Sequence, residues 1–309
     1  MGIKKVTQRP SQNEGLIFER SHSVIFGDCS NILPNLDSEV DLTFLDPPFN
    51  QQKDYDSCCD NLPENEYWKW MQEICERVFQ LTSDGGAIYF MQREKNTEQV
   101  LRVLRETGWT FQNLIIWKKM TSAVPSAMRF GKAFQIIAFA TKGNRPRVFN
   151  RLRINPPLLK HYKYERENGM FVTDVWDDIR ELTSGYFAGD EAIKKDTGER
   201  FHKQQSPISL LLRIILTSSK VGDCVFDPFA GTGTTAIVSK QLNRNSISIE
   251  IDETNAKSIK NRLAKIREAD KIEKFYKDYS CTENLKTIWG KTDSETVPQI
   301  KQAAALLNL

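Results

Sequence analysis

Short apolar runs rich in β-branched and aromatic residues alternate with longer stretches of helical periodicity along most of the chain. Such alternation predicts an α/β fold, in which a mostly parallel twisted sheet carries helices on both faces. The predicted strands are Ser23–Phe26, Asp41–Leu45, Ala87–Phe90, Leu114–Trp117, Phe134–Ala140, Cys224–Phe226 and Ser246–Ile251. The predicted helices are Glu64–Leu81, Lys95–Thr107, Ser209–Ser218, Thr234–Leu242 and Thr254–Ala269. The tail beyond Lys271 is helical or irregular, and packing on the domain and self-association both remain open for it.

This alternation stops between Gly143 and about Phe201, where Pro, Gly, charges and scattered aromatics dominate. Irregular segments of that length inside a compact domain are usually functional or disordered. From Lys142 to Gly169 the segment carries eight Lys and Arg against two Glu, with Phe149, Tyr162 and Tyr164 interleaved. That composition alone favours neither a solvated loop nor a nucleic-acid surface. Trp176 is predicted to pack against the domain.

The composition describes an ordinary globular protein and restricts where it works. With 309 residues, 39% hydrophobic and 27% charged, the chain suits one large α/β domain with an insertion. The longest apolar runs are too short or interrupted to span a bilayer, and the amino terminus lacks the apolar core of a secretion signal. We therefore expect a cytoplasmic protein. The net charge of +3 is too small to indicate a nucleic-acid partner by itself.

The six cysteines, at positions 29, 58, 59, 75, 224 and 281, form no CxxC pair, and the chain has only three histidines. We therefore expect no zinc site, and we expect the cysteines to be reduced and mostly structural. The chain also contains no Pro-Cys dipeptide, the setting that the cysteine nucleophile of cytosine-C5 methylation requires.

A glycine-containing turn lies between a predicted strand and helix, in the sequence VFDPFAGTGTT at 225–235. Glycines at such a turn let backbone N–H groups approach a ligand closely. The following strand ends near Glu250, whose carboxylate is placed to accept hydrogen bonds from ribose hydroxyls. The turn lacks the third glycine of a dinucleotide fingerprint and the lysine of a P-loop. A cofactor with a ribose but no pyrophosphate fits better, and S-adenosylmethionine is such a molecule.

The tetrad Asp46-Pro47-Pro48-Phe49 follows a predicted strand at its carboxyl end, the edge at which open α/β sheets bind ligands. The prolines fix the backbone, so a carboxylate and a rigid carbonyl can together accept both hydrogens of an exocyclic amino group. Phe49 would offer a ring face to a base taken out of its stack. The tetrad alone is also compatible with a rigid strand exit and a solvated Asp; the glycine turn favours catalysis.

These motifs together resemble the amino-methyltransferases of restriction-modification systems, specifically the circularly permuted β class, over about Val24 to Arg262. GDCSNILPNL at 27–36 resembles the segment ahead of the family's catalytic strand, and HKQQSP at 202–207 its His-Pro-Thr-Gln-Lys-Pro motif. Two residues depart from that motif. Ser206 stands where the family commonly has Lys, and Lys203 stands where it has Pro. Phe49 stands where Tyr is commoner.

The resemblance implies a Rossmann-like methyltransferase fold, S-adenosylmethionine as cofactor, no metal and direct in-line transfer. The implied catalytic residues are Asp46, Pro47, Pro48 and Phe49. The implied cofactor-binding residues are Asp28, Cys29, Gln205, Asp227, Phe229, Gly231, Thr232, Gly233, Thr234, Thr235 and Glu250. The candidate DNA-binding residues are Arg147, Arg151, Arg153, Lys160 and Lys163. Residues 1–142 would form the catalytic part, 143–201 a target-recognition insertion, 202–270 the cofactor-binding part, and 271–309 a C-terminal extension.

The predicted function is site-specific methylation of N6 of a flipped-out adenine in duplex DNA, because an Asp-led tetrad goes mostly with adenine in this family. N4 of cytosine is the alternative, since the two amines react alike. RNA methylation, an inactive regulatory protein and another nucleotide-dependent enzyme are further interpretations. Double-stranded DNA is the implied partner; a homodimer and a cognate restriction endonuclease are left open.

Overall fold

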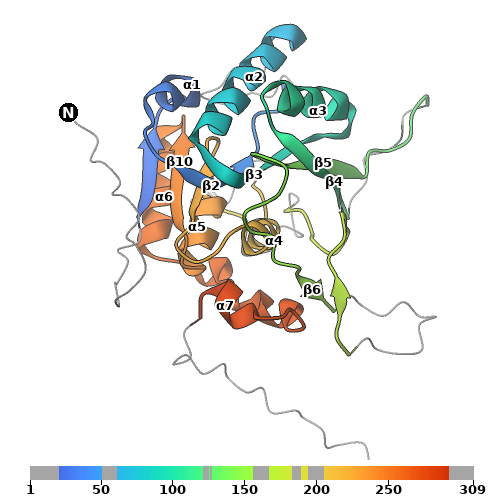
Figure 1. The fold of residues 1–309 in the computed structure, drawn as a ribbon, viewed down its shortest axis with the longest axis vertical. Coiled ribbons are helices and arrows are strands. Elements are labelled where there is room, and N and C mark those ends of the chain that lie inside the picture. Colours follow the sequence, from blue (N-terminus) through green and yellow to red (C-terminus); the bar gives the residue numbers. More distant parts are fainter. Residues whose placement is uncertain are drawn as a thin grey trace, which may run out of the picture.

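A computed structural model describes residues 21–50, 61–120, 125, 127–155, 167–182, 189–193 and 205–291. Its main feature is an eight-stranded sheet in the order β1-β10-β9-β2-β3-β5-β4-β8 (Figure 1). The strands are β1 His22–Phe26, β2 Val40–Leu45, β3 Thr82–Arg93, β4 Thr110–Lys118, β5 Phe134–Thr141, β8 Val175–Trp176, β9 Cys224–Asp227 and β10 Asn245–Glu250. A separate hairpin pairs β6 (Arg153–Ile154) with β7 (Met170–Phe171).

The strands from β1 to β3 in this order are all parallel, and only β5 runs against its neighbours β3 and β4. Because two reversals cancel, β4 points in the same direction as β3, and its parallel neighbour β8 does too. One edge of the sheet therefore collects the carboxyl ends of every strand except β5. We call it the carboxyl edge, and the opposite one the amino edge.

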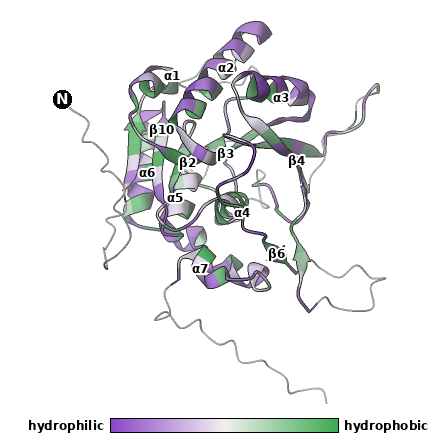
Figure 2. Ribbon diagram, in the orientation of Figure 1, coloured by the Kyte–Doolittle hydropathy of each residue, from purple (hydrophilic) through white to green (hydrophobic). Residues whose placement is uncertain are grey.

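Helices cover both faces of the sheet, as predicted. One face is covered by α1 (Cys29–Ile32), α2 (Glu64–Leu81) and α3 (Thr97–Glu106), and the other by α4 (Ile208–Ser218), α5 (Thr234–Gln241) and α7 (Leu285–Trp289). The helix α6 (Glu253–Ala264) packs beside α5 and β1. Along β3, Ile88 and Phe90 face the first layer, whereas Tyr89 and Met91 face the second, as the alternation of a strand requires. Figure 2 shows α4 as mostly hydrophobic, which fits its place between the sheet and the C-terminal elements.

Only one charged side chain lies in α4, and it ties the irregular segment to the core. Arg213 is 2% exposed and donates two hydrogen bonds to the Asp178 carboxylate, at 2.8 and 2.5 Å. Its Nε atom also donates to the Tyr279 hydroxyl at 3.2 Å. Trp176 lies against this guanidinium and is 4% exposed, which confirms that it packs against the domain.

The largest difference from prediction in the C-terminal part of the described chain is the end of α6. The predicted helix to Ala269 ends at Ala264, because Lys265 adopts an extended conformation. Asp270 then accepts from Arg262 and Arg267, which folds the chain back into the short 3-10 helix Glu268–Asp270. The remaining short helices are Leu33–Asn35, Glu94–Asn96 and Glu273–Tyr279. The helix Glu273–Tyr279 and α7 pack against the layer that holds α4. Within the described ranges, no helix is long and apolar enough to cross a membrane.

Candidate active site

Four predicted site carboxylates lie together at the carboxyl edge of the sheet. Glu250 ends β10 and Asp227 ends β9, while Asp46 directly follows β2 and Asp28 lies just beyond the end of β1. The registers align these ends, because Phe26 pairs with Glu250 across β1 and β10. Residues far apart in the sequence are thus brought to one edge, as expected for the binding site of an open α/β sheet.

The tetrad is held by hydrogen bonds from α2 and from the segment before α4. The Tyr67 hydroxyl of α2 donates to the Pro48 carbonyl at 2.8 Å, and Gln92 of β3 donates to the same hydroxyl at 2.9 Å. The Ser206 hydroxyl donates to Oδ2 of Asp46 at 3.1 Å. Among the described residues, Oδ1 of Asp46 and the Pro47 carbonyl have no hydrogen-bond donor. These two acceptors are therefore available to a substrate amino group.

Phe49 does not present its ring at the surface of this structure. It is 4% exposed and packs in the apolar cluster that contains α4. The next residue, Asn50, bonds both the amide and the carbonyl of Leu62 through its side chain, at 2.8 and 2.7 Å. The role of Phe49 as a stacking partner of the base stays a prediction.

The carboxylates at this edge are buried, which raises their pKa values by making the charged forms costly. Burial raises the pKa of Asp46 to about 7, assisted by the charge of Asp227 and opposed by Ser206 and Lys119. Burial also raises the pKa of Asp227 to about 7, although the Thr235 hydroxyl and the Phe229 amide donate to it. The pKa of Glu250 is raised for the same reason, burial. A ligand that brings positive charge to this edge would favour the charged forms of all three carboxylates.

Lys119 comes to this site from the end of β4 and was not among the predicted residues. Its ammonium lies 2.9 Å from the centroid of the Trp117 ring. Burial lowers the pKa of Lys119 to about 7, and the carboxylates of Glu181 and Asp46 limit the fall. The neighbouring amide of Met120 donates to Glu181 at 2.9 Å, so the two segments are joined beside Asp46.

The glycine turn has the geometry that its sequence predicts. Gly233 adopts φ +80°, and a Cβ there would lie 2.7 Å from Ile259 of α6, so no other residue fits. The Gly231 amide donates to Oε2 of Glu250 at 2.7 Å. Oε1 of Glu250 accepts from the Asp252 amide and from Asn255. A carboxylate has about four acceptor positions, so one on Oε2 remains for a ligand hydroxyl.

Four other predicted cofactor residues border this turn. Thr232, Thr234 and Thr235 are all buried, and the Arg262 guanidinium donates to the Thr232 carbonyl. The Thr234 hydroxyl is buried and has no hydrogen-bond partner within the described parts of the chain. An unpartnered buried hydroxyl at the start of α5 is a group that a bound ligand can satisfy. Phe229 is half-buried and meets the Trp70 ring edge-on, with centroids 5.6 Å apart.

The remaining predicted cofactor residues are used in the fold itself. Asp28 caps α1 by accepting from the Ser30 amide at 2.8 Å, and Cys29 is 4% exposed in the apolar layer beneath it. Gln205 accepts from the Ile193 amide and donates to the Glu191 carbonyl, so it fixes residues 189–193 at the entry to α4. Contacts of these three residues with a cofactor stay predictions.

The predicted DNA-binding residues lie in two separate places. Arg151 and Arg153 lie on or beside the β6–β7 hairpin, with guanidinium carbons 4.2 and 3.9 Å from the centroid of the Phe171 ring. Arg153 also donates to the Asn168 carbonyl at 2.8 Å. Lys160 and Lys163 lie outside the described residues.

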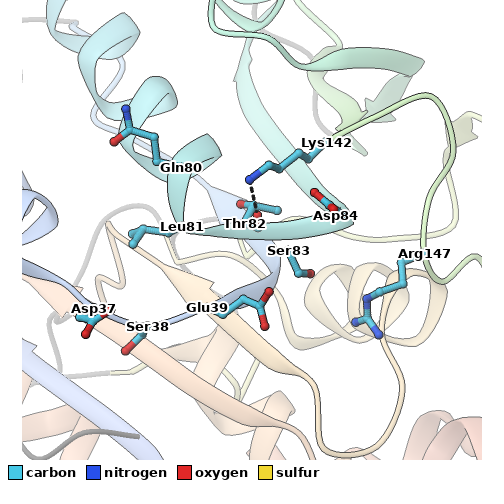
Figure 3. Close-up of a pocket in the computed structure, with 10 residues that line it drawn as sticks. All are labelled: Asp37, Ser38, Glu39, Gln80, Leu81, Thr82, Ser83, Asp84, Lys142 and Arg147. Carbon is cyan, nitrogen blue, oxygen red and sulfur yellow. Dashed lines mark hydrogen bonds between the residues drawn. The ribbon is translucent and has the colours of Figure 1, made fainter. Parts of the chain in front are cut away.

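Arg147, in contrast, is at the amino edge. It pairs with Asp223 at 2.6 Å and Asp41 at 3.0 Å, and its side chain is 21% exposed. It borders a cavity of about 520 Å³ together with Asp84 and Lys142 (Figure 3). Asp41 and Asp46 lie at opposite ends of β2, roughly 16 Å apart for an extended chain. The structure therefore does not bring Arg147 together with the tetrad that begins at Asp46.

Comparison with known proteins identifies the family. A sequence profile described as DNA methylase, of the N6/N4 type, matches residues 40–261. The type II methyltransferase M.HpaI of Haemophilus parainfluenzae is 30% identical over 240 residues, which cover 76% of this chain and 73% of that protein. The chain belongs to the N6/N4 DNA methylase family.

Solved structures agree on the fold of this methyltransferase. The M1.HpyAVI complex with S-adenosylmethionine superposes with a TM-score of 0.54 at 22% identity, covering 78% of this chain and 98% of that one. The PvuII DNA methyltransferase, described as cytosine-N4-specific, gives a TM-score of 0.57 at 17% identity, covering 88% and 94%. The predicted class of fold, that of S-adenosylmethionine-dependent methyltransferases, is confirmed.

Proposed function

We propose that this DNA methyltransferase transfers a methyl group from S-adenosylmethionine to N6 of an adenine extruded from duplex DNA. The observation that carries the proposal is the pair of available acceptors at the tetrad, Oδ1 of Asp46 and the carbonyl of Pro47. An exocyclic amino group has two hydrogens, and these acceptors can bind both. Asp at the head of the tetrad favours adenine, as in the family that the sequence resembles.

The carboxyl edge fits S-adenosylmethionine in its charge and its polar groups. The cofactor carries a sulfonium and an ammonium against one carboxylate, so it brings net positive charge to Asp46, Asp227 and Glu250, whose pKa values are raised. Its ribose hydroxyls can occupy the spare acceptor position of Glu250, and a polar group can satisfy the buried Thr234 hydroxyl. When bound, the cofactor supplies a methyl group on a sulfonium that is open to in-line attack.

The residues of the tetrad would activate the amine by position and electrostatics. Hydrogen bonds to Asp46 and the Pro47 carbonyl draw the amino group out of conjugation with the ring, which frees its lone pair for attack. The new N–C bond forms as the S–C bond breaks, and the surplus proton leaves from nitrogen afterwards. The Asp46 carboxylate, with a pKa of about 7, can accept that proton near neutral pH.

The order of the motifs supports assignment to the circularly permuted β class. The strand before the tetrad, β2, comes early in the chain, and β9 before the glycine turn comes late, yet the two strands are neighbours. Residues 143–201, between them in the sequence, would serve as the target-recognition region. Arg151 and Arg153 in that region would bind phosphates.

Nucleoside mass analysis tests the proposed function. Mixed-sequence duplex DNA is incubated with the protein and labelled S-adenosylmethionine, digested, and its nucleosides are separated. Labelled N6-methyladenine is the expected product. N4-methylcytosine would instead overturn the choice of adenine as the target base. The PvuII enzyme, described as cytosine-N4-specific, is a precedent for that outcome in the same fold. Label in a parallel RNA sample, with none in DNA, would overturn the proposed substrate.

A further inference from the structure

The connection between β4 and β5 leaves the sheet at the edge where Asp46 lies. β4 ends at Lys118 on the carboxyl edge, and β5 begins at Phe134 on the same edge. Lys119, the first residue of the connection, is close enough for its charge to act on Asp46. In Figure 1 the residues directly before β5 extend away from the sheet.

The connection presents large apolar side chains to solvent. Phe130 is 99% exposed and Met128 is 90% exposed, and Arg129 lies between them. Single exposed apolar residues are common on proteins, but two large ones within three residues of a projecting segment indicate a binding surface. Because this segment lies at the edge that holds the candidate active site, its partner would be the substrate of that site.

The charges of the connection indicate which partner binds there. Residues 118–133 include Lys118, Lys119, Arg129 and Lys132 and no Asp or Glu. Lys132 is anchored to Glu94 at the end of β3, at 3.0 Å. Apolar side chains flanked only by cations suit a partner with stacked apolar bases inside a shell of phosphates.

We propose that Phe130, with Met128 beside it, inserts into duplex DNA at the target base pair and fills the space that the extruded base leaves. The inference rests on the proposed function, because an amino group inside a duplex must leave the stack before it reaches Asp46. Apolar wedges of this kind unstack base steps in other DNA-binding proteins. Lys118 and Arg129 would then contact phosphates beside the opened step.

The test compares Phe130→Ala with Phe111→Ala as a matched control. Phe111 is a 49% exposed phenylalanine near the start of β4, at the opposite edge of the sheet. For wild type and both variants, kcat/KM is measured for methylation of plasmid DNA in its native duplex form and after heat denaturation. Binding of S-adenosylmethionine, measured by calorimetry, reports whether each variant is folded and can bind its cofactor.

Phe130→Ala is expected to lower kcat/KM on duplex DNA by about tenfold or more, since an aromatic side chain stacked on a base contributes that much. On denatured DNA the loss should be below about twofold, because no stack has to be opened there. Cofactor affinity and the Phe111→Ala control should match wild type. If wild type methylates duplex DNA alone, the comparison of Phe130→Ala with Phe111→Ala on duplex DNA tests the proposal.

The proposal that Phe130 inserts into DNA would be overturned by unchanged duplex methylation in Phe130→Ala. An equal loss of kcat/KM on both DNA forms would also overturn it. Either result leaves the proposed function standing, because wild type still methylates DNA. Absence of methylation by wild type would instead refute the proposed function, and with it the inference that depends on it.

Discussion

Asp46 keeps one oxygen for the substrate because Ser206 binds the other. The serine stands where the family that the sequence resembles commonly has lysine, and Lys119 brings an ammonium to the same carboxylate from β4. A hydrogen bond to a carboxylate favours its charged form, as does a nearby cation. At the scale of single residues, Ser206 and Lys119 therefore oppose the rise in the pKa of Asp46 that burial causes.

The pH dependence of catalysis should report this arrangement. Burial raises the pKa of Asp46 to about 7, so the carboxylate that accepts the amine is lost as pH falls through that value. We expect kcat/KM to decline below about pH 7. Ser206→Ala removes a hydrogen bond to the charged form, which should raise the pKa and move the decline to higher pH by about half a unit or more.

The control is Ser206→Thr, which retains the hydroxyl and should retain the wild-type pH profile. Profiles of kcat/KM against pH for the three proteins decide the matter, because this parameter reports ionisations of the free enzyme. An identical acid limb in wild type and Ser206→Ala would show that Ser206 does not act on Asp46.

The chemistry of single residues could be predicted from sequence only where it is local. The Asp46 tetrad and the glycine turn were found because a strand end, prolines and glycines occur within a few residues of one another. Ser206 lies 160 positions from Asp46, so that contact depends on the whole fold. Lys119 could have been suspected, since it lies two residues beyond a predicted strand, but the partner of a strand-end cation depends on strand order.

At the scale of elements, the end of β10 supports the turn that leads into α5. Glu250 joins Gly231 of the turn to Asp252 and Asn255 at the start of α6. The conformation of the turn therefore depends on one carboxylate from the strand that follows α5. Strands and helices of this part were predictable from periodicity, whereas the hydrogen bonds between them were not.

Glu250→Gln should weaken cofactor binding, since the amide nitrogen cannot accept the bonds that the carboxylate accepts. A lost charge-assisted hydrogen bond costs roughly 1.5–3 kcal/mol, so the dissociation constant for S-adenosylmethionine should rise about 10- to 100-fold. Isothermal calorimetry measures it. Glu253→Gln is the matched control, because that side chain is exposed on α6 and pairs only with Lys257 in the described structure. Equal affinities of wild type and Glu250→Gln would remove Glu250 from the cofactor site.

At the scale of the whole molecule, the arginines of residues 143–201 have two different roles that sequence could not separate. Arg147, Arg151 and Arg153 all lie in the basic stretch from Lys142 to Gly169. The fold nevertheless places Arg147 on Asp41 and Asp223 at the amino edge and leaves Arg151 and Arg153 on a hairpin. The partners of Arg147 come from the starts of β2 and β9, and only the assembled sheet brings them together.

The double variant Arg151→Ala/Arg153→Ala should weaken DNA binding and reduce the slope of log K against log salt by roughly two units. Titration of duplex DNA by fluorescence anisotropy at several salt concentrations measures the slope. Lys257→Ala/Lys260→Ala, which removes two exposed cations from α6, is the control and should leave the slope unchanged. A slope unaffected by the hairpin variant would place the interface elsewhere.

Arg147→Met should instead act on stability, because it leaves Asp41 and Asp223 buried without their cation. The loss of one member of a buried ionic cluster is expected to lower the free energy of unfolding by roughly 3 kcal/mol. Urea unfolding measures it. Lys257→Ala, which removes an exposed pair on α6, should cost less than about 0.5 kcal/mol. A fall in the salt slope at full stability would reassign Arg147 to the DNA interface.

The most direct test of the whole account is transfer of labelled methyl from S-adenosylmethionine to duplex plasmid DNA by wild type and Asp46→Asn, measured side by side with cofactor affinity. The substitution keeps the size of the side chain, but it removes the charge and presents a donor to the amine. The account predicts labelled DNA with wild type and a loss of at least about 100-fold in rate with Asp46→Asn at saturating cofactor. Cofactor affinity should fall far less than the rate, because Asp227 and Glu250 still meet the cofactor's positive charge. Equal labelling by the two proteins would contradict it.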